Sequence, residues 1–385
     1  MIDIARLQRK GYSVSALREM ARRELPRVLF DMVDGGAGDE NTLRRNVSAL
    51  AAIEFAPKLL EGAPNRDQTI ELFGVRLTSP LIVAPTGLAG LLWPHAEIAT
   101  ARAAARFGTI YSTSHASTAT IEDIGKATTG AKWMQVFIYK DRGLTSEFAA
   151  RAAAAGYNGL ILTVDTQVMA GRDRDARNGM SFPLRWTPGN VFDFITHPRW
   201  ILRMRATPSP TFVNYGARTS LGAFAPLMIE QLTPAVDWGD VEWLRGTWNG
   251  PLILKGILHP DEARTAHRVG VDAVVVSNHG GRQLDGAAPT VAALSGVVDA
   301  LGGALPVLID GGFRRGVDIL KAIALGARAV LIGRAHLWGV ASAGEEGAFW
   351  ALELFRREID RAMALGGWDS LDRLNRGVLI DSSAG

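Results

Sequence analysis

Residues 252–281 read LILKGILHPDEARTAHRVGVDAVVVSNHGG, and they carry the clearest indication of the fold class. Two short, mainly apolar runs, Leu252–Lys255 and Ala273–Asn278, flank a segment of helical period from Pro260 to Val269. Continuous apolar runs are typical of strands that are buried on both faces, and such strands occur in parallel sheets whose connections are helices. The stretch therefore predicts a strand, a crossover helix and a second, parallel strand.

The same alternation repeats along most of the chain. Further apolar runs have the length and the flanking residues of strands at 80–85, 109–114, 132–137, 159–165, 306–310 and 329–333. Stretches of helical period lie at 96–106, 144–155, 290–300 and 316–325. Eight strands that lead into helices predict an α/β fold, the (β/α)8 TIM barrel, with its chemistry at the carboxyl ends of the strands. An open, doubly wound sheet is the alternative, but the phosphate-binding pattern GxGxxG is missing after the early strands.

Three segments stand outside the repeated barrel units. Residues 1–75 open with short amphipathic patterns and form a predicted N-terminal helical segment, and residues 371–385 form a C-terminal tail. The barrel is expected over 76–370. Residues 180–236 are rich in proline and far longer than an ordinary connection, so they form a predicted insertion after the fourth strand.

Part of the insertion, residues 190–208, mixes large apolar and basic side chains. Arg199 and Arg203 lie among Trp200 and Leu202. Such a mixture suits a segment that lies in a membrane interface. It equally suits a lid or a subunit contact, since long loops in compact domains are often functional. Both interpretations stay open at the level of sequence.

The composition limits the class of protein. The 385 residues are 47% hydrophobic and 21% charged, which is typical of a globular chain rather than a disordered one. A formal charge of +3 is too small to predict nucleic-acid binding. The absence of cysteine excludes disulfides, thiolate metal ligands, iron–sulfur clusters and cysteine nucleophiles.

No secretory signal and no membrane span are predicted. The first 26 residues carry charges throughout and lack the apolar run of a signal peptide. No window reaches the roughly 18 uncharged apolar residues that a spanning helix requires. We therefore expect a cytoplasmic protein, and any membrane contact should be peripheral, on the inner face of the cytoplasmic membrane.

Polar residues follow the predicted strands at the points where the strands end. The fourth strand ends at Asp165, the fifth ends at Lys255, and the sixth runs into Ser277-Asn-His-Gly-Gly-Arg-Gln-Leu-Asp285. Because the carboxyl ends of barrel strands meet on one face, these side chains should converge. A histidine followed by two glycines and an arginine, beside a carboxylate and an amine, indicates a catalytic site more than a structural histidine.

The last two predicted strands end in glycines and arginines, at Asp310-Gly-Gly-Phe-Arg-Arg-Gly316 and Gly333-Arg334. Glycines near helix starts expose backbone N–H groups, and arginines add positive charge, so these turns predict a site for a phosphosugar or a mononucleotide. Asp310 suits a sugar hydroxyl or the N-cap of the next helix. No metal site and no serine nucleophile are predicted, because the histidines lack metal-ligand spacing and no GxSxG occurs.

At these positions the chain resembles a known family. The run from Ser277 to Asp285 is similar to the active-site signature of the FMN-dependent α-hydroxy acid dehydrogenases and oxidases. Residues 85–94 and the insertion at His197-Pro-Arg-Trp200 look most like the mandelate dehydrogenases of that family, in which the insertion attaches the protein to a membrane. The resemblance implies FMN as cofactor, a small 2-hydroxy acid as substrate and a homotetramer.

The resemblance also implies roles for individual residues. His279 would be the base that takes a proton from the substrate, and Asp165 would orient it. Arg282 would bind the substrate carboxylate with help from Arg172, and Lys255 would stabilise the reduced flavin. The other implied flavin contacts are Pro85, Thr86, Gly87, Ser114, Gln135, Thr163, Ser277 and Asp310, and those implied for the phosphate are Gly312, Arg314, Gly333 and Arg334.

The chain departs from the family pattern around the substrate. Met32 and Phe137 stand where the family places tyrosines whose hydroxyls reach the bound acid, and Ala116 stands where short-chain oxidases often carry tryptophan. Losing one donor near a charged group costs about 1.5 to 3 kcal/mol, so a small hydroxy acid should bind weakly. We therefore expect an aromatic or bulky 2-hydroxy acid, held mainly by Arg282 and Arg172. The alternative is that neighbouring side chains replace the lost donors and the substrate is ordinary mandelate.

The electron acceptor and two other functions stay open. Gly87 stands where a family residue packs near flavin N5, and a small residue there favours a dehydrogenase that reduces a quinone or carrier over an oxidase that uses oxygen. A phosphate-binding barrel isomerase would share the glycine turns but would not need His279 and Arg282 together. A flavin-binding or membrane-attached protein whose chemistry has decayed would account for Met32 and Phe137.

Overall fold

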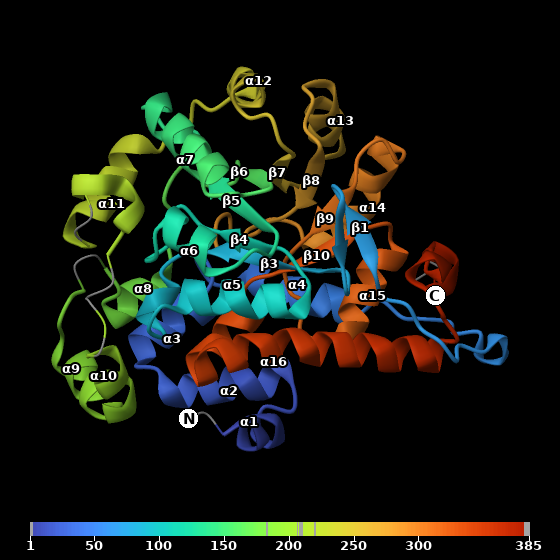
Figure 1. Ribbon diagram of the computed structural model, residues 1–385, viewed down its shortest axis with the longest axis horizontal. Coiled ribbons are helices and arrows are strands. Elements are labelled where there is room, and N and C mark those ends of the chain that lie inside the picture. The colour runs from blue at the N-terminus through green and yellow to red at the C-terminus, as the bar shows by residue number, and fades with distance from the viewer. Residues whose placement is uncertain (1–2, 182–183, 206, 208–210, 219–220, 381–385) are drawn as a thin grey trace.

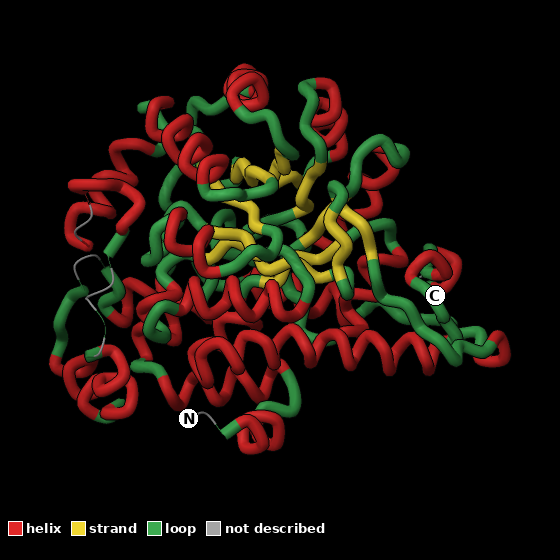
Figure 2. Tube along the Cα trace, in the orientation of Figure 1, coloured by secondary structure: helices red, strands yellow, loops and turns green. Residues whose placement is uncertain are grey.

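The computed structural model describes residues 3–181, 184–205, 207, 211–218 and 221–380. In this part of the chain eight parallel strands close into a barrel, in the order β10-β3-β4-β5-β6-β7-β8-β9, with helices around it (Figures 1 and 2). The α/β TIM-barrel fold is therefore confirmed. The strands are β3 (Leu81–Thr86), β4 (Tyr111–Thr113), β5 (Lys132–Val136), β6 (Gly159–Thr163), β7 (Leu252–Ile257), β8 (Ala273–Val276), β9 (Val307–Ile309) and β10 (Ala329–Ile332).

The barrel strands are buried because helices cover their outer faces and neighbouring side chains fill the interior. Every residue of β5, β6, β8 and β10 is buried, which is the reason their sequences are continuous apolar runs. The register between β7 and β8 shifts after Lys255, at Gly256. Gly256 has φ +119, and a Cβ there would lie 2.9 Å from the Cβ of Asp165. This glycine lets the ends of β6 and β7 approach each other closely at the site.

The helices around the barrel include all those predicted from the sequence, together with α6, α12 and α16, which were not predicted. The last helix, α16, is bent at Ala343 and Gly344, and it packs against α5 and α2 on one side of the molecule (Figure 1). The helices are α5 (Ala96–Phe107), α6 (Ile121–Ala127), α7 (Arg142–Ala154), α12 (Trp238–Thr247), α13 (Pro260–Arg268), α14 (Thr290–Leu301), α15 (Gly316–Ala324) and α16 (Arg334–Gly366).

The N-terminal segment contains the short amphipathic helices that the sequence predicts. Asp3 and Ser13 cap the first two of them by accepting hydrogen bonds from backbone N–H groups three residues later. A small antiparallel hairpin, which was not predicted, follows before the barrel. The elements are α1 (Ile4–Lys10), α2 (Val14–Glu24), α3 (Arg27–Asp34), α4 (Asn41–Ala51), a 3-10 turn at Leu59–Glu61, β1 (Ile70–Leu72) and β2 (Val75–Leu77). Three more 3-10 turns lie elsewhere in the chain, at Ala89–Leu91 after β3 and at Leu371–Arg373 and Arg376–Val378 after α16.

The insertion after β6 is largely helical. Helix α8 (Asp173–Asn178) precedes it, and the insertion contains α9 (Pro188–Ile195), α10 (Pro198–Met204), a 3-10 turn at Val213–Arg218 and α11 (Leu221–Gln231). Thr187 and Asn190 form a reciprocal cap at the start of α9. Residues 182–183, 206, 208–210 and 219–220 of the expected insertion, like 1–2 and 381–385 at the chain ends, lie outside the described residues.

Helix α10 contacts the body of the protein with one side. The indole of Trp200 donates to the carbonyl of Leu91 at 3.0 Å. The guanidinium of Arg203 lies 4.1 Å from the centroid of the Trp93 ring and 2.9 Å from the Glu24 carboxylate. Two members of the basic and apolar pattern seen in the sequence thus hold the insertion against the barrel and α2, while Leu202 on the same helix is exposed.

Candidate active site

The ends of β6 and β8 bring Asp165 and His279 together. His279 Nδ1 lies 2.8 Å from Asp165 Oδ1 and 3.4 Å from Thr166 Oγ1. Since an ionised carboxylate only accepts hydrogen bonds, Nδ1 carries the proton and Nε2 is the atom that can accept one. His279 has φ +56, a left-handed conformation that is rare outside glycine, and Gly280 and Gly281 continue it. Such backbone strain is found most often at functional sites.

The electrostatics of this pair suit a base. Burial lowers the pKa of His279 below its usual value, although the charge of Asp165 opposes this. Burial alone would raise the pKa of Asp165, but the charges of His279 and Lys255 bring it down to about 2. At neutral pH the imidazole is therefore neutral and the carboxylate is ionised, the states that proton abstraction requires.

A buried ammonium lies beside the pair. Lys255 Nζ donates to Ser277 Oγ at 3.0 Å and lies 3.3 Å from Asp310 Oδ2. Burial lowers the pKa of Lys255, but the charges of Asp310 and Asp165 more than offset this and raise it. Asp310 Oδ1 and Asp165 Oδ2 are buried without a hydrogen-bond partner in the described part of the chain. Unpartnered carboxylate oxygens around a fixed positive charge indicate that a polar ligand with hydroxyl or N–H donors belongs here.

Two arginines meet at the C-terminal end of α3. Arg282 donates to the carbonyls of Gly35 and Val33 at 3.0 and 3.3 Å. Arg334 donates to the same two carbonyls at 2.8 and 3.0 Å, and to the carbonyl of Gly280 at 3.0 Å. The terminal carbonyls of a helix attract cations, which accounts for this convergence. The guanidinium of Arg334, expected at a phosphate, is thus already hydrogen-bonded to backbone carbonyls.

Positive charge is crowded at this end of the site. Burial, together with the charges of Arg172 and Arg334, lowers the pKa of Arg282 well below its usual value. Burial and the charge of Arg314 lower the pKa of Arg334 to about 9. Buried guanidiniums that repel one another are stabilised by an anion, and they bind carboxylates and phosphates with matching geometry. The arrangement is therefore suited to anionic ligands.

The turn after β9 has the shape of a glycine cradle. Gly312 has φ +90, and a Cβ there would lie 2.3 Å from the carbonyl oxygen of Asn46. The backbone N–H groups of Arg314 and Arg315, however, donate to Asp318, at 3.0 and 2.9 Å. The first turn of α15 is thus capped by a side chain, so a phosphate at this turn would depend on the glycines and the arginine side chains more than on the helix start.

The other expected cofactor residues line the same end of the barrel. Thr86 Oγ1 lies 3.2 Å from Nε2 of His336, a residue that the sequence analysis did not single out. Nδ1 of His336 donates to the carbonyl of Ile332 at 3.0 Å, and burial lowers the pKa of His336 to about 4. His336 is therefore neutral, and its Nε2 accepts a hydrogen bond from the hydroxyl of Thr86. Residues at or just after the strand ends are Pro85, Gly87, Ser114, Gln135, Thr163, Ser277, Asp310 and Gly333.

Ala116 leaves room only for glycine at position 87. A Cβ on Gly87 would lie 2.8 Å from the Cβ of Ala116. The two residues come from the loops after β3 and β4, so these loops pass each other closely at the mouth of the barrel. Gln135 Oε1 accepts a hydrogen bond from the backbone of His115 at 3.3 Å, which fixes the β4 loop to β5.

A polar cluster that the sequence analysis missed lies behind Phe137. The rings of Phe137 and His115 meet edge to face with centroids 4.6 Å apart. His115 Nδ1 contacts the hydroxyls of Tyr139, at 3.1 Å, and Tyr215, and the two hydroxyls are 2.8 Å apart. Burial, with the charge of His279, lowers the pKa of His115 to about 3, so it is neutral. Tyr215 belongs to the insertion, a hundred residues away along the chain.

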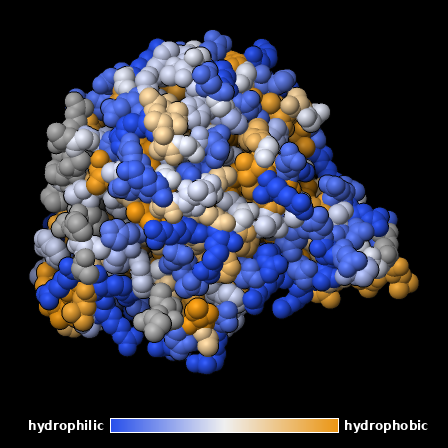
Figure 3. Space-filling view, viewed as in Figure 1, coloured by the Kyte–Doolittle hydropathy of each residue, from blue (hydrophilic) through white to orange (hydrophobic). Residues whose placement is uncertain are grey.

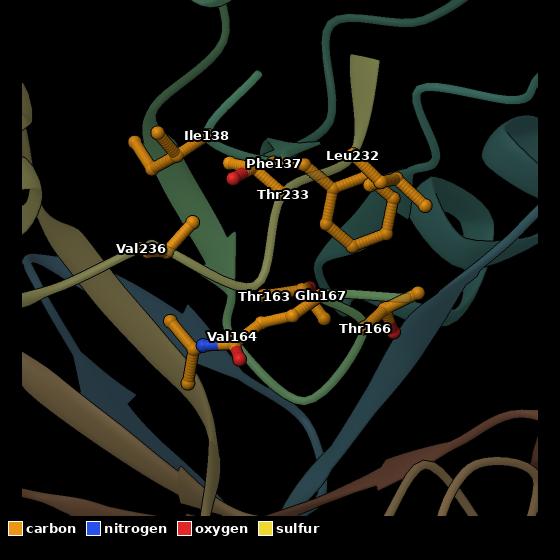
Figure 4. A pocket seen from close by; sticks show the side chains of 9 residues that line it. All are labelled: Phe137, Ile138, Thr163, Val164, Thr166, Gln167, Leu232, Thr233 and Val236. Atoms are coloured by element: carbon orange, nitrogen blue, oxygen red, sulfur yellow. The ribbon is translucent and has the colours of Figure 1, made fainter. Parts of the chain in front are cut away.

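A small pocket opens beside the base. It lies at the ends of β5 and β6, and the segment before α12 closes it (Figure 4). Thr166, which contacts His279, is one of its lining residues. The pocket is lined by Phe137, Ile138, Thr163, Val164, Thr166, Gln167, Leu232, Thr233 and Val236 (Figure 4). The lining is mainly apolar, and the insertion contributes part of it.

The two remaining substrate residues expected from the sequence lie on the N-terminal segment and in the loop between β6 and α8. Met32 is buried within α3, two residues before Asp34 at the end of that helix. Arg172 precedes α8, and its Nη1 donates to Asp175 Oδ2 at 3.2 Å. The charge of Arg172 acts on Arg282, so the two guanidiniums share one region of the site.

Comparisons with known proteins agree over almost the whole chain. A family model described as "FMN-dependent dehydrogenase" matches residues 21–381. The chain is similar to an L-lactate dehydrogenase of Caulobacter sp. (strain K31), with 40% identity over 95% of this chain and 98% of that protein. It is also 40% identical to a peroxisomal (S)-2-hydroxy-acid oxidase of Oryza sativa subsp. japonica, over 94% of each chain. Among solved structures, the monotopic membrane protein (S)-mandelate dehydrogenase matches with a TM-score of 0.93 and 37% identity, over 96% of this chain and 99% of that one.

Proposed function

Because the chain belongs to the FMN-dependent dehydrogenase family, whose members oxidise 2-hydroxy acids with FMN, we propose that its own substrate is an aromatic or otherwise bulky 2-hydroxy acid. The product is the 2-keto acid. The named relatives include enzymes for lactate and for mandelate, so the family alone does not choose between a small and a large acid. The observation that carries the proposal is Phe137, whose ring lines a small pocket next to the base and brings no hydroxyl to the site.

FMN fits the residues on the carboxyl face of the barrel. The buried Lys255 ammonium suits the electron-rich edge of the flavin ring, and the unpartnered oxygen of Asp310 suits a hydroxyl of the sugar chain. The phosphate suits the cradle at Gly312, with Arg314 and Arg334 nearby. The further contacts that we propose are Pro85, Thr86, Gly87, Ser114, Gln135, Thr163, Ser277 and Gly333. When bound, FMN supplies the acceptor for the two electrons that the substrate loses.

The protein residues then bind the acid and take its proton. Arg282 and Arg172 bind the carboxylate, whose negative charge stabilises the crowded guanidiniums. Nε2 of His279 accepts the proton that the substrate releases, from carbon 2 or from the hydroxyl. Asp165 stays ionised because of its low pKa, and it stabilises the imidazolium that forms. Met32 and Phe137 contribute apolar contact to the rest of the acid.

The electron acceptor that we propose is a quinone or a protein carrier. The support is Gly87, where a larger residue is excluded by Ala116, and the likeness to a dehydrogenase structure. An oxidase that uses oxygen is the alternative. Stopped-flow mixing of the reduced protein with oxygen decides between them, because rapid reoxidation contradicts the dehydrogenase proposal.

We also propose that the insertion attaches the protein to the cytoplasmic membrane from the inside. Among the described residues, no helix combines the length and the apolar character needed to cross a bilayer. Helices α9 and α10 nevertheless present Phe192, Ile195 and Leu202, each about two-thirds exposed, and apolar atoms gather there in Figure 3. The similar mandelate dehydrogenase is described as monotopic. A homotetramer remains a proposal from the family resemblance.

Two experiments test these proposals. Anaerobic mixing with glycolate, lactate, mandelate and longer aromatic 2-hydroxy acids should bleach the flavin absorbance fastest with the bulky acids. A purified protein that holds no FMN, or one that no 2-hydroxy acid bleaches, contradicts the proposed reaction. For the membrane, sedimentation with anionic lipid vesicles should fall sharply in a Phe192→Ser/Ile195→Ser variant, and equal sedimentation of both proteins contradicts the attachment.

A further inference from the structure

Helix α8 places a carboxylate of the protein itself beside the guanidiniums that we assign to the substrate. Arg172 precedes the helix and Asp175 lies one turn later, with Arg172 Nη1 3.2 Å from Asp175 Oδ2. The Asp175 side chain is only 14% exposed. Its second oxygen, Oδ1, is buried and has no hydrogen-bond partner in the described part of the chain. The Arg172 contact therefore holds Asp175 in place, and in the described part of the chain only one of its two carboxylate oxygens has a hydrogen-bond partner.

The charges around Asp175 come from several elements. Burial raises the pKa of Asp175, and the charge of Asp31 on α3 adds to this, whereas Arg172, Arg282 and Arg174 favour its ionised form. Burial and the charges of Arg172 and Arg334 lower the pKa of Arg282. Among the groups that act on this guanidinium most strongly, two carboxylates oppose the effect. These are Asp175 and Asp34.

Asp34 already has partners of its own. Its two oxygens accept hydrogen bonds from Arg18 at 2.6 and 2.8 Å, and Arg174 lies 3.0 Å away. An acid that is paired with two other guanidiniums contributes little further to Arg282. Asp175 is thus the carboxylate that balances the pair formed by Arg172 and Arg282.

We propose that Asp175 is the built-in counter-ion of Arg172 and Arg282, and that it limits how tightly the site binds any carboxylate. A nearby negative charge weakens the binding of every anion to the pair. A 2-hydroxy acid offsets this loss because its hydroxyl also reaches His279, whereas an acid without the hydroxyl has no such contact. Asp175 therefore excludes simple carboxylates from a site that must be strongly positive to hold its substrate. The inference rests on the proposed role of the arginine pair.

The test compares acids that differ only in the 2-hydroxyl group. Phenylacetate is mandelate without this group, and propionate is lactate without it. In Asp175→Asn we expect phenylacetate, propionate and acetate to bind about five- to tenfold more tightly than in the unchanged protein, where tenfold corresponds to about 1.4 kcal/mol. Binding is measured on the oxidised holoprotein by isothermal titration calorimetry. The KM for mandelate should fall by a similar factor, because the charge of Asp175 acts on the carboxylate that all these acids share.

Two further variants separate a charge effect from a structural one. Asp173→Asn removes an exposed carboxylate from the same helix and should leave all these affinities unchanged. Asp175→Glu keeps the charge and should retain the low affinity for phenylacetate. If Asp175→Asn does not accumulate as folded protein, Asp175→Ser is measured in its place. Affinities in Asp175→Asn, or in Asp175→Ser where it replaces that variant, that equal those of Asp173→Asn or are weaker overturn the proposal.

The calorimetric measurement does not depend on turnover. A holoprotein that no 2-hydroxy acid reduces contradicts the proposed function, yet the tighter binding of phenylacetate by Asp175→Asn would still be seen. Conversely, normal reduction by mandelate with unchanged anion affinities in Asp175→Asn contradicts the role of Asp175 alone. The two failures are therefore distinguishable.

Discussion

Asp165 Oδ1 lies 2.8 Å from Nδ1 of His279, and this one contact fixes the tautomer of the imidazole, its orientation and the charge state that follows proton transfer. The contact joins residues 114 positions apart, at the ends of β6 and β8. The proton transfer that we assign to His279 depends on it.

Replacing Asp165 with asparagine should slow flavin reduction by about 10²- to 10⁴-fold, because the imidazolium loses its counter-charge. The carboxylate raises the pKa of His279, so its removal should move the acid limb of the pH–rate profile to lower pH. Anaerobic stopped-flow reduction across a pH series measures both effects. An acid limb that stays in place would show that another group is the base.

The unchanged enzyme should lose activity only below the usual pKa range of histidine. Burial lowers the pKa of His279, and the base is active when neutral, so kcat/KM should be level above about pH 6.5 and fall as the pH decreases further. His279→Gln should keep FMN and abolish reduction. Unchanged reduction in that variant contradicts the role of His279.

Phe137→Tyr should shift the preference toward small acids. The new hydroxyl restores a donor near the substrate, worth about 1.5 to 3 kcal/mol, so the KM for lactate should fall about tenfold or more. Mandelate is measured for comparison, and its KM should fall less, because the hydroxyl weakens the apolar contact that we assign to Phe137 and the rest of the acid. Equal effects on KM for lactate and mandelate would mean that Phe137 does not select the substrate side chain.

Acid should destabilise the protein through a buried histidine. The pKa of His336 is lowered to about 4 in the folded state, below its ordinary value of about 6.5 in the unfolded chain. The stability that this neutral group contributes is therefore present above pH 6.5 and is lost as the pH falls toward 4, by up to about 3 kcal/mol. Thermal unfolding of His336→Gln should depend less on pH over that window than unfolding of the unchanged protein.

Gly312→Ala should impair both folding and FMN retention. The new Cβ would lie 2.3 Å from the carbonyl oxygen of Asn46, at a φ of +90. Gly303 is a matched control, because its φ is +86 and nothing lies within 4 Å of a Cβ there. Gly303→Ala should cost only about 1 to 2 kcal/mol of backbone strain, whereas Gly312→Ala adds the clash. Equal melting temperatures and equal FMN content in both variants would contradict the close approach.

The sequence predicted the barrel well because its signals are local. A continuous apolar run such as 159–165 reports burial on both faces without any knowledge of its neighbours. The hairpin of β1 and β2 escaped prediction because strands of three residues are too short to show a period. The convergence of Asp165, Lys255 and His279 followed from one topological rule, that barrel strands end on the same face.

The barrel, the end of it that carries the polar residues and the family could all be predicted from the sequence, because apolar runs and a contiguous signature are local features of the chain. The atoms that those residues contact could be seen only in the folded protein. Arg334 meets the carbonyls of α3, His336 meets Thr86, and Tyr215 of the insertion meets His115, all across a hundred residues or more. Such contacts depend on burial and on the packing of distant elements, which leave no periodic mark on the chain.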